Sequence, residues 1–145
     1  MLRVICLLIA LCIFSPTLLH AKQMSFKSPA GNFTVNVPKN FVSKAVKGGF
    51  MVANPNGASL TITFFKHNNK SSCDLLKAIL TKIKVDDLEF DEDNDDESCS
   101  AVFKMKKINF DIEVYKEDED FAVMDLRTGS DDKVLDKIFD SLQFE

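Results

Sequence analysis

An acidic run holds the densest group of side chains in this chain that could bind a ligand or take part in catalysis. Nine of the twelve residues from Asp86 to Glu97 are Asp or Glu. Within the run, Asp91, Asp93 and Asp95 have the alternate spacing of the first ligands of a calcium-binding loop. However, Asp96 occupies the position at which such a loop needs glycine for its sharp turn. The run is therefore not an ordinary EF-hand.

Three hypotheses account for this run. It could be a weak divalent-cation site with Asp91, Asp93 and Asp95 as ligands. The loop 86–97 could instead dock onto a basic protein or peptide, as in an inhibitor, because complementary charge speeds and orients association. It could also be a solvated turn whose repulsive charges protect a sheet edge.

No signature of an enzyme accompanies these carboxylates. His67 is the only histidine after residue 21, and it lies in a polar segment with Lys66, Asn68 and Asn69. The sequence contains no G-x-S-x-G, H-E-x-x-H or P-loop motif that would supply a partner for it. The carboxylates crowd one turn with no apolar pocket evident to raise a pKa, as glycosidase chemistry would need. We expect a solvent-exposed loop histidine, no catalytic residue and no cofactor.

Two cysteines, Cys73 and Cys99, flank a helical pattern and the acidic run. A helix of about 12 residues is roughly 18 Å long, and a strand of about five or six residues returns over a similar distance. Cys99 should therefore come back beside Cys73, and we predict a disulfide between them. The alternatives are two unpaired thiols or a redox-active pair, although the C-x-x-C spacing of the latter is absent.

The first 21 residues resemble a secretory signal. Arg3 precedes an apolar run from Val4 to Phe14, and a cut after Ala21 is expected. Cys6 and Cys12 would leave with this segment. The alternative is an uncleaved anchor, but the run is short for a membrane span. We expect a secreted or periplasmic protein with no stable membrane insertion, in an oxidising compartment that favours the disulfide.

Composition restricts the partners. The formal charge of −4 becomes −5 once Arg3 is removed, and an acidic exported protein is a poor candidate for nucleic acid. Two sequons, at Asn32 and Asn69, would carry glycans only in a eukaryotic source.

Strand-like alternation and two helical patterns define the fold class. The expected strands are 23–27, 33–37, 41–46, 50–53, 60–64, 85–90, 101–106, 108–115 and 121–127. A first helix is expected from Ser71 to about Lys84, with Asp74 completing a capping box. A second helix is expected after Gly129, with Ser130 as its cap.

This order predicts an α+β fold, with a mostly antiparallel sheet of short strands and two amphipathic helices packed on it. No linker or internal repeat divides residues 22–145, so we expect a single domain after the signal peptide. Most phenylalanines fall on inward strand positions. Phe65 is an exception, which lies either under a helix or at an exposed partner surface.

Short motifs at both ends of residues 22–145 resemble the PsbP-like family. The opening Phe26-Lys-Ser-Pro-Ala-Gly-Asn-Phe33-Thr-Val-Asn-Val-Pro38, the pair Gly49-Phe50 and the closing Ile138-Phe-Asp-Ser-Leu-Gln-Phe144 carry this resemblance. The family includes bacterial exported proteins and an extrinsic subunit of photosystem II. The resemblance implies a sandwich of an antiparallel sheet between helices and a non-enzymatic binding or accessory role. No functional residue of the family has a match in this sequence.

Overall fold

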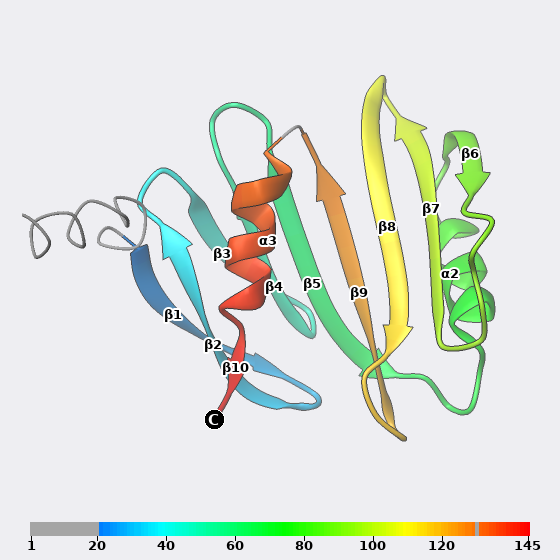
Figure 1. Ribbon diagram of the computed structural model, residues 1–145, viewed down its shortest axis with the longest axis horizontal. Coiled ribbons are helices and arrows are strands. Elements are labelled where there is room, and N and C mark those ends of the chain that lie inside the picture. The colour runs from blue at the N-terminus through cyan, green and yellow to red at the C-terminus, as the bar shows by residue number, and fades with distance from the viewer. Residues whose placement is uncertain (1–20, 130) are drawn as a thin grey trace, which may run out of the picture.

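Ten strands and two helices form the part of the chain that the computed structural model describes, residues 21–129 and 131–145. The larger sheet has seven strands (Figure 1), in the order β3 (Val42–Val46), β4 (Gly49–Ala53), β5 (Ser59–Lys66), β9 (Phe121–Thr128), β8 (Ile108–Lys116), β7 (Ser98–Met105) and β6 (Asp86–Phe90). The smaller sheet consists of β1 (Ala21–Ser28), β2 (Gly31–Pro38) and β10 (Gln143–Phe144). The helices are α2 (Ser72–Leu80) and α3 (Asp132–Asp140). All described strand pairs are antiparallel, which confirms the α+β class.

The strands at the N-terminal end divide between the two sheets, whereas the sequence predicted a single antiparallel sheet. The β1–β2 hairpin folds over the larger sheet because the inward side chains of β2, Phe33, Val35 and Val37, are almost fully buried against it. The short strand β10, which the sequence did not predict, pairs with β2 through Phe144 and Phe33. These contacts build the first hydrophobic core, which also contains Phe26, Phe41, Phe50, Val52, Leu60, Ile62, Phe64, Val123, Leu135 and Ile138.

Helix α3 covers the same face of the larger sheet as this hairpin. Leu135 and Ile138 of α3 are buried in the first core, as their helical spacing predicts. The turn before the helix needs glycine, because Gly129 has φ +91° and a Cβ there would lie 2.6 Å from the Cα of Ala58. The predicted cap, Ser130, lies outside the described residues.

Helix α2 covers the opposite face of the sheet, behind β7 in Figure 1. Its residues Leu75, Leu76 and Leu80 pack on strands β7, β8 and β9 in a second core, which also contains Cys99, Ala101, Phe103, Ile112, Val114 and Ala122. Ala122 and Val123 belong to different cores, so β9 is covered on both faces. Phe65 packs against the second core, which resolves its placement in favour of a position under the helix.

Helix α2 is shorter than its sequence predicts. It starts as expected, because the Ser71 hydroxyl accepts a hydrogen bond from the backbone N–H of Asp74 at 3.2 Å. It ends at Leu80, where the Thr81 hydroxyl donates to the carbonyls of Lys77 and Ala78. Ile83 therefore leaves the apolar face and is partly exposed. Neither described helix is long and apolar enough to cross a membrane. The predicted signal segment, apart from Ala21, lies outside the described residues.

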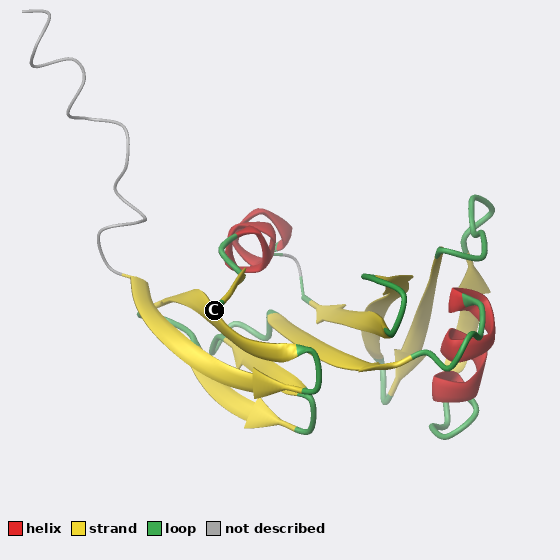
Figure 2. Cartoon of the chain, turned by 90° about the horizontal axis from the view of Figure 1, so that it is seen from below, coloured by secondary structure: helices red, strands yellow, loops and turns green. Residues whose placement is uncertain are grey.

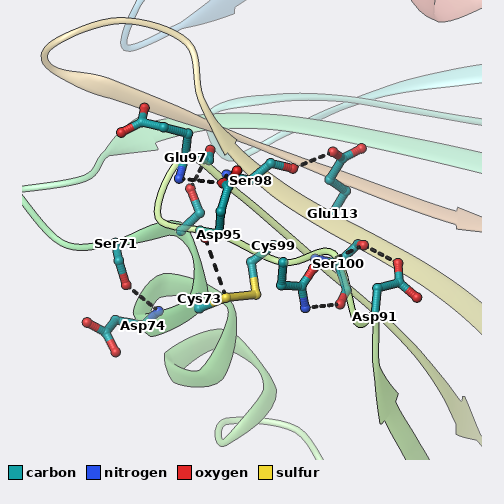
Figure 3. The surroundings of a disulfide bond; sticks show 12 residues. Ser71, Cys73, Asp74, Asp91, Asp95, Glu97, Ser98, Cys99, Ser100 and Glu113 are labelled. Atoms are coloured by element: carbon teal, nitrogen blue, oxygen red, sulfur yellow. Dashed lines mark hydrogen bonds between the residues drawn. A yellow bond between two sulfur atoms is a disulfide. The ribbon is translucent and has the colours of Figure 1, made fainter.

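The predicted disulfide is present. Cys73 at the start of α2 bonds to Cys99 in β7, with the two Cα atoms 5.0 Å apart (Figure 3). Cys99 is fully buried in the second core. The bridge therefore fixes the first turn of α2 to the sheet that its apolar face covers.

Removing this bridge should destabilise the fold. In the chain-entropy model, a loop with a sequence separation of 26 residues contributes about 3.5 kcal/mol by constraining the unfolded chain. We expect the double variant Cys73→Ala/Cys99→Ala to lose a similar free energy of unfolding, measured by urea denaturation. Reduced wild-type protein should show the same loss. A loss below about 1 kcal/mol would contradict this role.

Candidate functional site: an acidic groove beside helix α3

The described residues leave one part of the larger sheet uncovered. Helix α2 covers one face of β7, β8 and β9, while α3 and the smaller sheet cover the other face mainly over β4, β5 and part of β9. Figure 2 shows the two helices on opposite sides of the twisted sheet, at different positions along it. The face of β7 and β8 that lies opposite α2 is therefore open beside α3.

The floor of this open region is polar. Asp111 and Glu113 of β8 alternate with the buried Ile112 and lie on the open face. In the strand register, Asp111 pairs with Arg127 of β9, and Glu113 pairs with Asp125. Four charged side chains therefore lie next to one another across two strands.

Helix α3 forms one wall of a groove over this floor. Asp132 and Asp136 are four residues apart, so they lie on one side of the helix. On the other side lies Asp91, directly after β6, whose side chain accepts a short hydrogen bond from the Ser100 hydroxyl. The cavity between these walls has a volume of about 430 Å³ and is lined by Asp91, Ser100, Asp111, Ile112, Glu113, Asp125, Arg127, Asp132 and Asp136. It contains six carboxylates and one guanidinium group.

The groove widens at one end into a larger and partly apolar cavity of about 790 Å³. The two cavities share Asp111, Arg127 and Asp132, so they form one continuous surface. Val102 and Ile108 line the wide end and are exposed, and Phe110 stacks on Phe103 with ring centroids 5.2 Å apart. We call the combined surface the acidic groove.

Arg127 joins the floor of the acidic groove to its wall. Its Nε donates to Asp125 Oδ1 at 2.9 Å and its Nη2 donates to Asp125 Oδ2 at 2.8 Å. Its Nη1 donates to Asp136 of α3, and the guanidinium lies 5.8 Å from the ring centroid of Phe139. The one cation of the smaller cavity is therefore already paired with two carboxylates. At the wide end, Lys104 is paired with Asp87, so the groove as a whole stays negative.

Two carboxyl groups of the floor, those of Asp111 and Asp125, have raised pKa values. Burial raises the pKa of Asp125, and the hydrogen bonds and positive charge of Arg127 only partly offset this. Burial also raises the pKa of Asp111, with further contributions from the negative charges of Asp132 and Asp91. Hydrogen bonds to Asp125 raise the pKa of Arg127, so the guanidinium stays charged. A cation entering the groove would relieve the repulsion at Asp111.

The three predicted cation ligands are not brought together. Asp91 faces the groove, whereas Asp95 Oδ1 accepts the backbone N–H groups of Glu97 and Ser98 at 2.8 and 2.7 Å, as Figure 3 shows. These two backbone hydrogen bonds lower the pKa of Asp95. Asp93 is exposed and lines neither cavity of the groove. Within residues 21–129 and 131–145, no group of three or more His, Cys, Asp or Glu side chains is placed to hold a metal ion.

The acidic run is more ordered than its charge suggests. Its one amide, Asn94, accepts the backbone N–H of Ser100 at 2.7 Å and donates to the carbonyl of Ser100 at 2.9 Å. These bonds hold the turn between β6 and β7 beside Ser100, which also bonds to Asp91. The run therefore supplies both an exposed strand at the sheet edge, β6, and three side chains of the groove, Asp87, Glu89 and Asp91.

His67 is not the solvent-exposed residue that the sequence suggested. Only 5% of its surface is exposed. Its Nδ1 accepts the backbone N–H of Asn69 at 3.1 Å, and its Nε2 lies 3.2 Å from the carbonyl of Asp118, to which it donates in this tautomer. Both ring nitrogens hold loops together, which is a structural role.

Charge is distributed unevenly between the ends of the molecule. Residues 22–73 contain seven lysines and no Asp or Glu, so all 22 acidic residues follow residue 73. Five of the lysines lie on or between β1 and β4, at the left of Figure 1, whereas the strands that form the floor of the acidic groove, β8 and β9, lie farther to the right. The end with β1–β4 is therefore basic and the end with the groove is acidic.

Removing the cation of the floor should destabilise the fold in a pH-dependent way. In Arg127→Ala, Asp125 keeps its burial but loses its partner, and its pKa rises further. A buried carboxyl group with a raised pKa destabilises the folded state when it is charged, and this cost disappears when it is protonated. The loss of unfolding free energy should therefore be largest near neutral pH. We expect about 3 kcal/mol there, falling as the pH drops through the raised pKa of Asp125.

Urea denaturation at neutral and acidic pH measures this loss. The control is Lys104→Ala, which breaks an exposed ion pair with Asp87 whose side chains are 48% and 69% exposed. The control should cost less than about 1 kcal/mol at either pH. An Arg127→Ala loss as small as that of Lys104→Ala, or one that grows at acidic pH, would contradict the role given to Arg127.

Comparisons with known proteins add no relative. No protein-family model matches the chain, and no curated protein matches it. The resemblance to the PsbP-like family therefore stays an expectation from short sequence motifs.

Proposed function

We propose that this chain is a small exported, non-enzymatic binding protein, and that its acidic groove holds a segment of a basic polypeptide. The observation that carries this proposal is the acidic part of the groove, the cavity of about 430 Å³, which is lined by six carboxylates from two strands, a helix and a turn and by a single, already paired arginine. Such a surface attracts a cationic segment and disfavours acidic ones.

The shape of the groove favours a polypeptide over a small ion. The acidic part and the partly apolar wide end share three residues and extend along α3 and β8. Lysine or arginine side chains would lie among Asp111, Glu113 and Asp132, while an apolar side chain would contact Val102 and Ile108. An extended basic segment with one apolar residue matches this order of charges and contacts.

The disulfide supports export, because such bonds persist in oxidising compartments. The PsbP-like resemblance favours an accessory subunit of a larger assembly. If a partner needs its basic segment to be accessible, binding of that segment in the groove would inhibit the partner.

A charge-matched pair of variants tests the groove. The probe is a fluorescein-labelled peptide of alternating lysine and leucine. We expect Asp111→Asn/Asp132→Asn to weaken its affinity at least about tenfold, or about 1.4 kcal/mol. The control Asp74→Asn/Asp86→Asn removes the same charge from exposed sites outside the groove and should change affinity less than about twofold. Fluorescence anisotropy measures both, and equal losses would show general charge attraction instead of a groove.

As the pH is lowered, peptide binding should begin to weaken at a higher pH than it would if Asp111 had an ordinary aspartate pKa. Because burial and the neighbouring negative charges raise the pKa of Asp111, this group takes up a proton above the usual aspartate range near about 3.9. Its raised pKa means that the charge which attracts the peptide is present at neutral pH and is lost as the pH falls through that value. We expect the affinity of wild-type protein to decline in this window by anisotropy. The decline should be smaller in Asp111→Asn, and identical pH profiles would contradict the assignment.

A further inference from the structure

A separate, smaller cavity lies at the other end of α3. It has a volume of about 270 Å³. Four aromatic rings line it, from Phe64, Tyr115, Phe139 and Phe144, together with the carboxylates of Glu117 and Asp140. Its lining shares no residue with either cavity of the acidic groove. We call it the aromatic pocket.

The rings of the aromatic pocket are held in place by the fold. Phe64 and Tyr115 both lie opposite Val123 in the strand register, so they share one row across β5, β9 and β8. Phe64 is only 3% exposed, and its ring meets Phe144 edge-on with centroids 5.4 Å apart. Phe139 projects from α3, where its ring also attracts the guanidinium of Arg127. The aromatic wall therefore combines residues from three strands and a helix.

The electrostatic environment of the pocket is negative. Neither Glu117 nor Asp140 forms an ion pair with any described residue, and both are exposed at the pocket. Asp140 is the last residue of α3, where the helix dipole also favours a positive charge. The hydroxyl of Tyr115 forms no hydrogen bond within residues 21–129 and 131–145. Burial, together with the negative charge of Glu117, raises the pKa of Tyr115.

We propose that the aromatic pocket binds a small organic cation, a methylated ammonium group of the kind found in choline. Aromatic rings attract such a cation through their negative faces, and nearby carboxylates add to this attraction. The pocket is smaller than the roughly 300–1,000 Å³ of sites for drug-sized ligands, so it suits a compact head group. A methylated ammonium needs few hydrogen-bond acceptors, and the aromatic walls offer few. This inference does not depend on peptide binding in the acidic groove.

A neutral isostere separates charge recognition from apolar filling. Choline and 3,3-dimethylbutan-1-ol have nearly the same shape and differ in the charge of the central atom. We expect saturable binding of choline by titration calorimetry, at least about fivefold tighter than binding of the alcohol. Absence of saturable choline binding, or equal affinity for the two compounds, would overturn the proposal.

Variants of the pocket locate the binding. Phe139→Leu keeps an apolar side chain but removes a ring, so it should weaken choline about fivefold and leave the alcohol nearly unchanged. Glu117→Gln/Asp140→Asn should also weaken choline, whereas the control Asp74→Asn/Asp86→Asn should not. The groove variant Asp111→Asn/Asp132→Asn should bind choline as the wild type does, which separates a failure of this proposal from a failure of the acidic groove. Choline binding that is unchanged in both pocket variants would overturn the assignment of the site.

A second measurement tests whether the pocket takes a free cation or the head group of a lipid. Sedimentation with phosphatidylcholine vesicles, compared with phosphatidylglycerol vesicles, shows whether the pocket also accepts the lipid-borne group. Binding of free choline alone supports a soluble cation as the ligand, and specific binding to phosphatidylcholine as well supports a lipid head group. If Phe139→Leu loses binding to both choline and phosphatidylcholine vesicles, the pocket is supported as the site for either ligand. If the wild type binds neither probe, the proposal is overturned.

Discussion

One guanidinium group determines how the open face of this protein is arranged. Arg127 on β9 bonds to Asp125 on its own strand and to Asp136 on α3, so it links the sheet to the helix beside the groove. Asp125 is buried, and burial opposes its charge. The arginine keeps this carboxylate compatible with a folded core, while its own charge is neutralised. Among the described residues, the other carboxylates of the smaller cavity, Asp91, Asp111, Glu113 and Asp132, form no ion pair.

The separation of covered and open surface follows from the two cores. α2 and its disulfide cover one face of β7–β9, and α3 with the smaller sheet covers the opposite face, mainly over β4, β5 and part of β9. Because the covers are offset along the sheet, each face has a region without one. The open face beside α3 is polar in its sequence, with Asp111 and Glu113 at alternate positions of β8. Placement of the two helices thus creates both the acidic groove and the aromatic pocket.

Much of the fold could be predicted from short-range patterns. The alternation in β2, β5 and β8, the apolar face of α2 and the pairing of Cys73 with Cys99 all depend on local spacing and length. The smaller sheet could not be predicted, because β10 has two residues and forms only through long-range contact with β2. The burial of His67 could not be predicted for the same reason, because its ring also bonds to Asp118, in a loop that is distant in sequence.

The candidate sites were less predictable than the fold. The density of carboxylates in the acidic run led to the prediction of three cation ligands there. Of these three, only Asp91 lies in the groove. The other groove residues are scattered singly over β8, β9 and α3, and strand register alone brings Asp111 and Arg127 together. The available signals were weak: charged residues at alternate positions in β8, and Asp132 and Asp136 one helical turn apart. The aromatic pocket gave no local signal, because its rings come from four separate elements.

The uneven distribution of lysines and carboxylates gives the molecule a large electric dipole moment along its long axis. A freely diffusing copy would be turned by the field of a charged surface or macromolecule before contact, so that one end leads on approach. The torque acts over roughly the Debye length, about 8 Å at physiological ionic strength. Dissolved salt would therefore change the orientation of encounter as well as its strength.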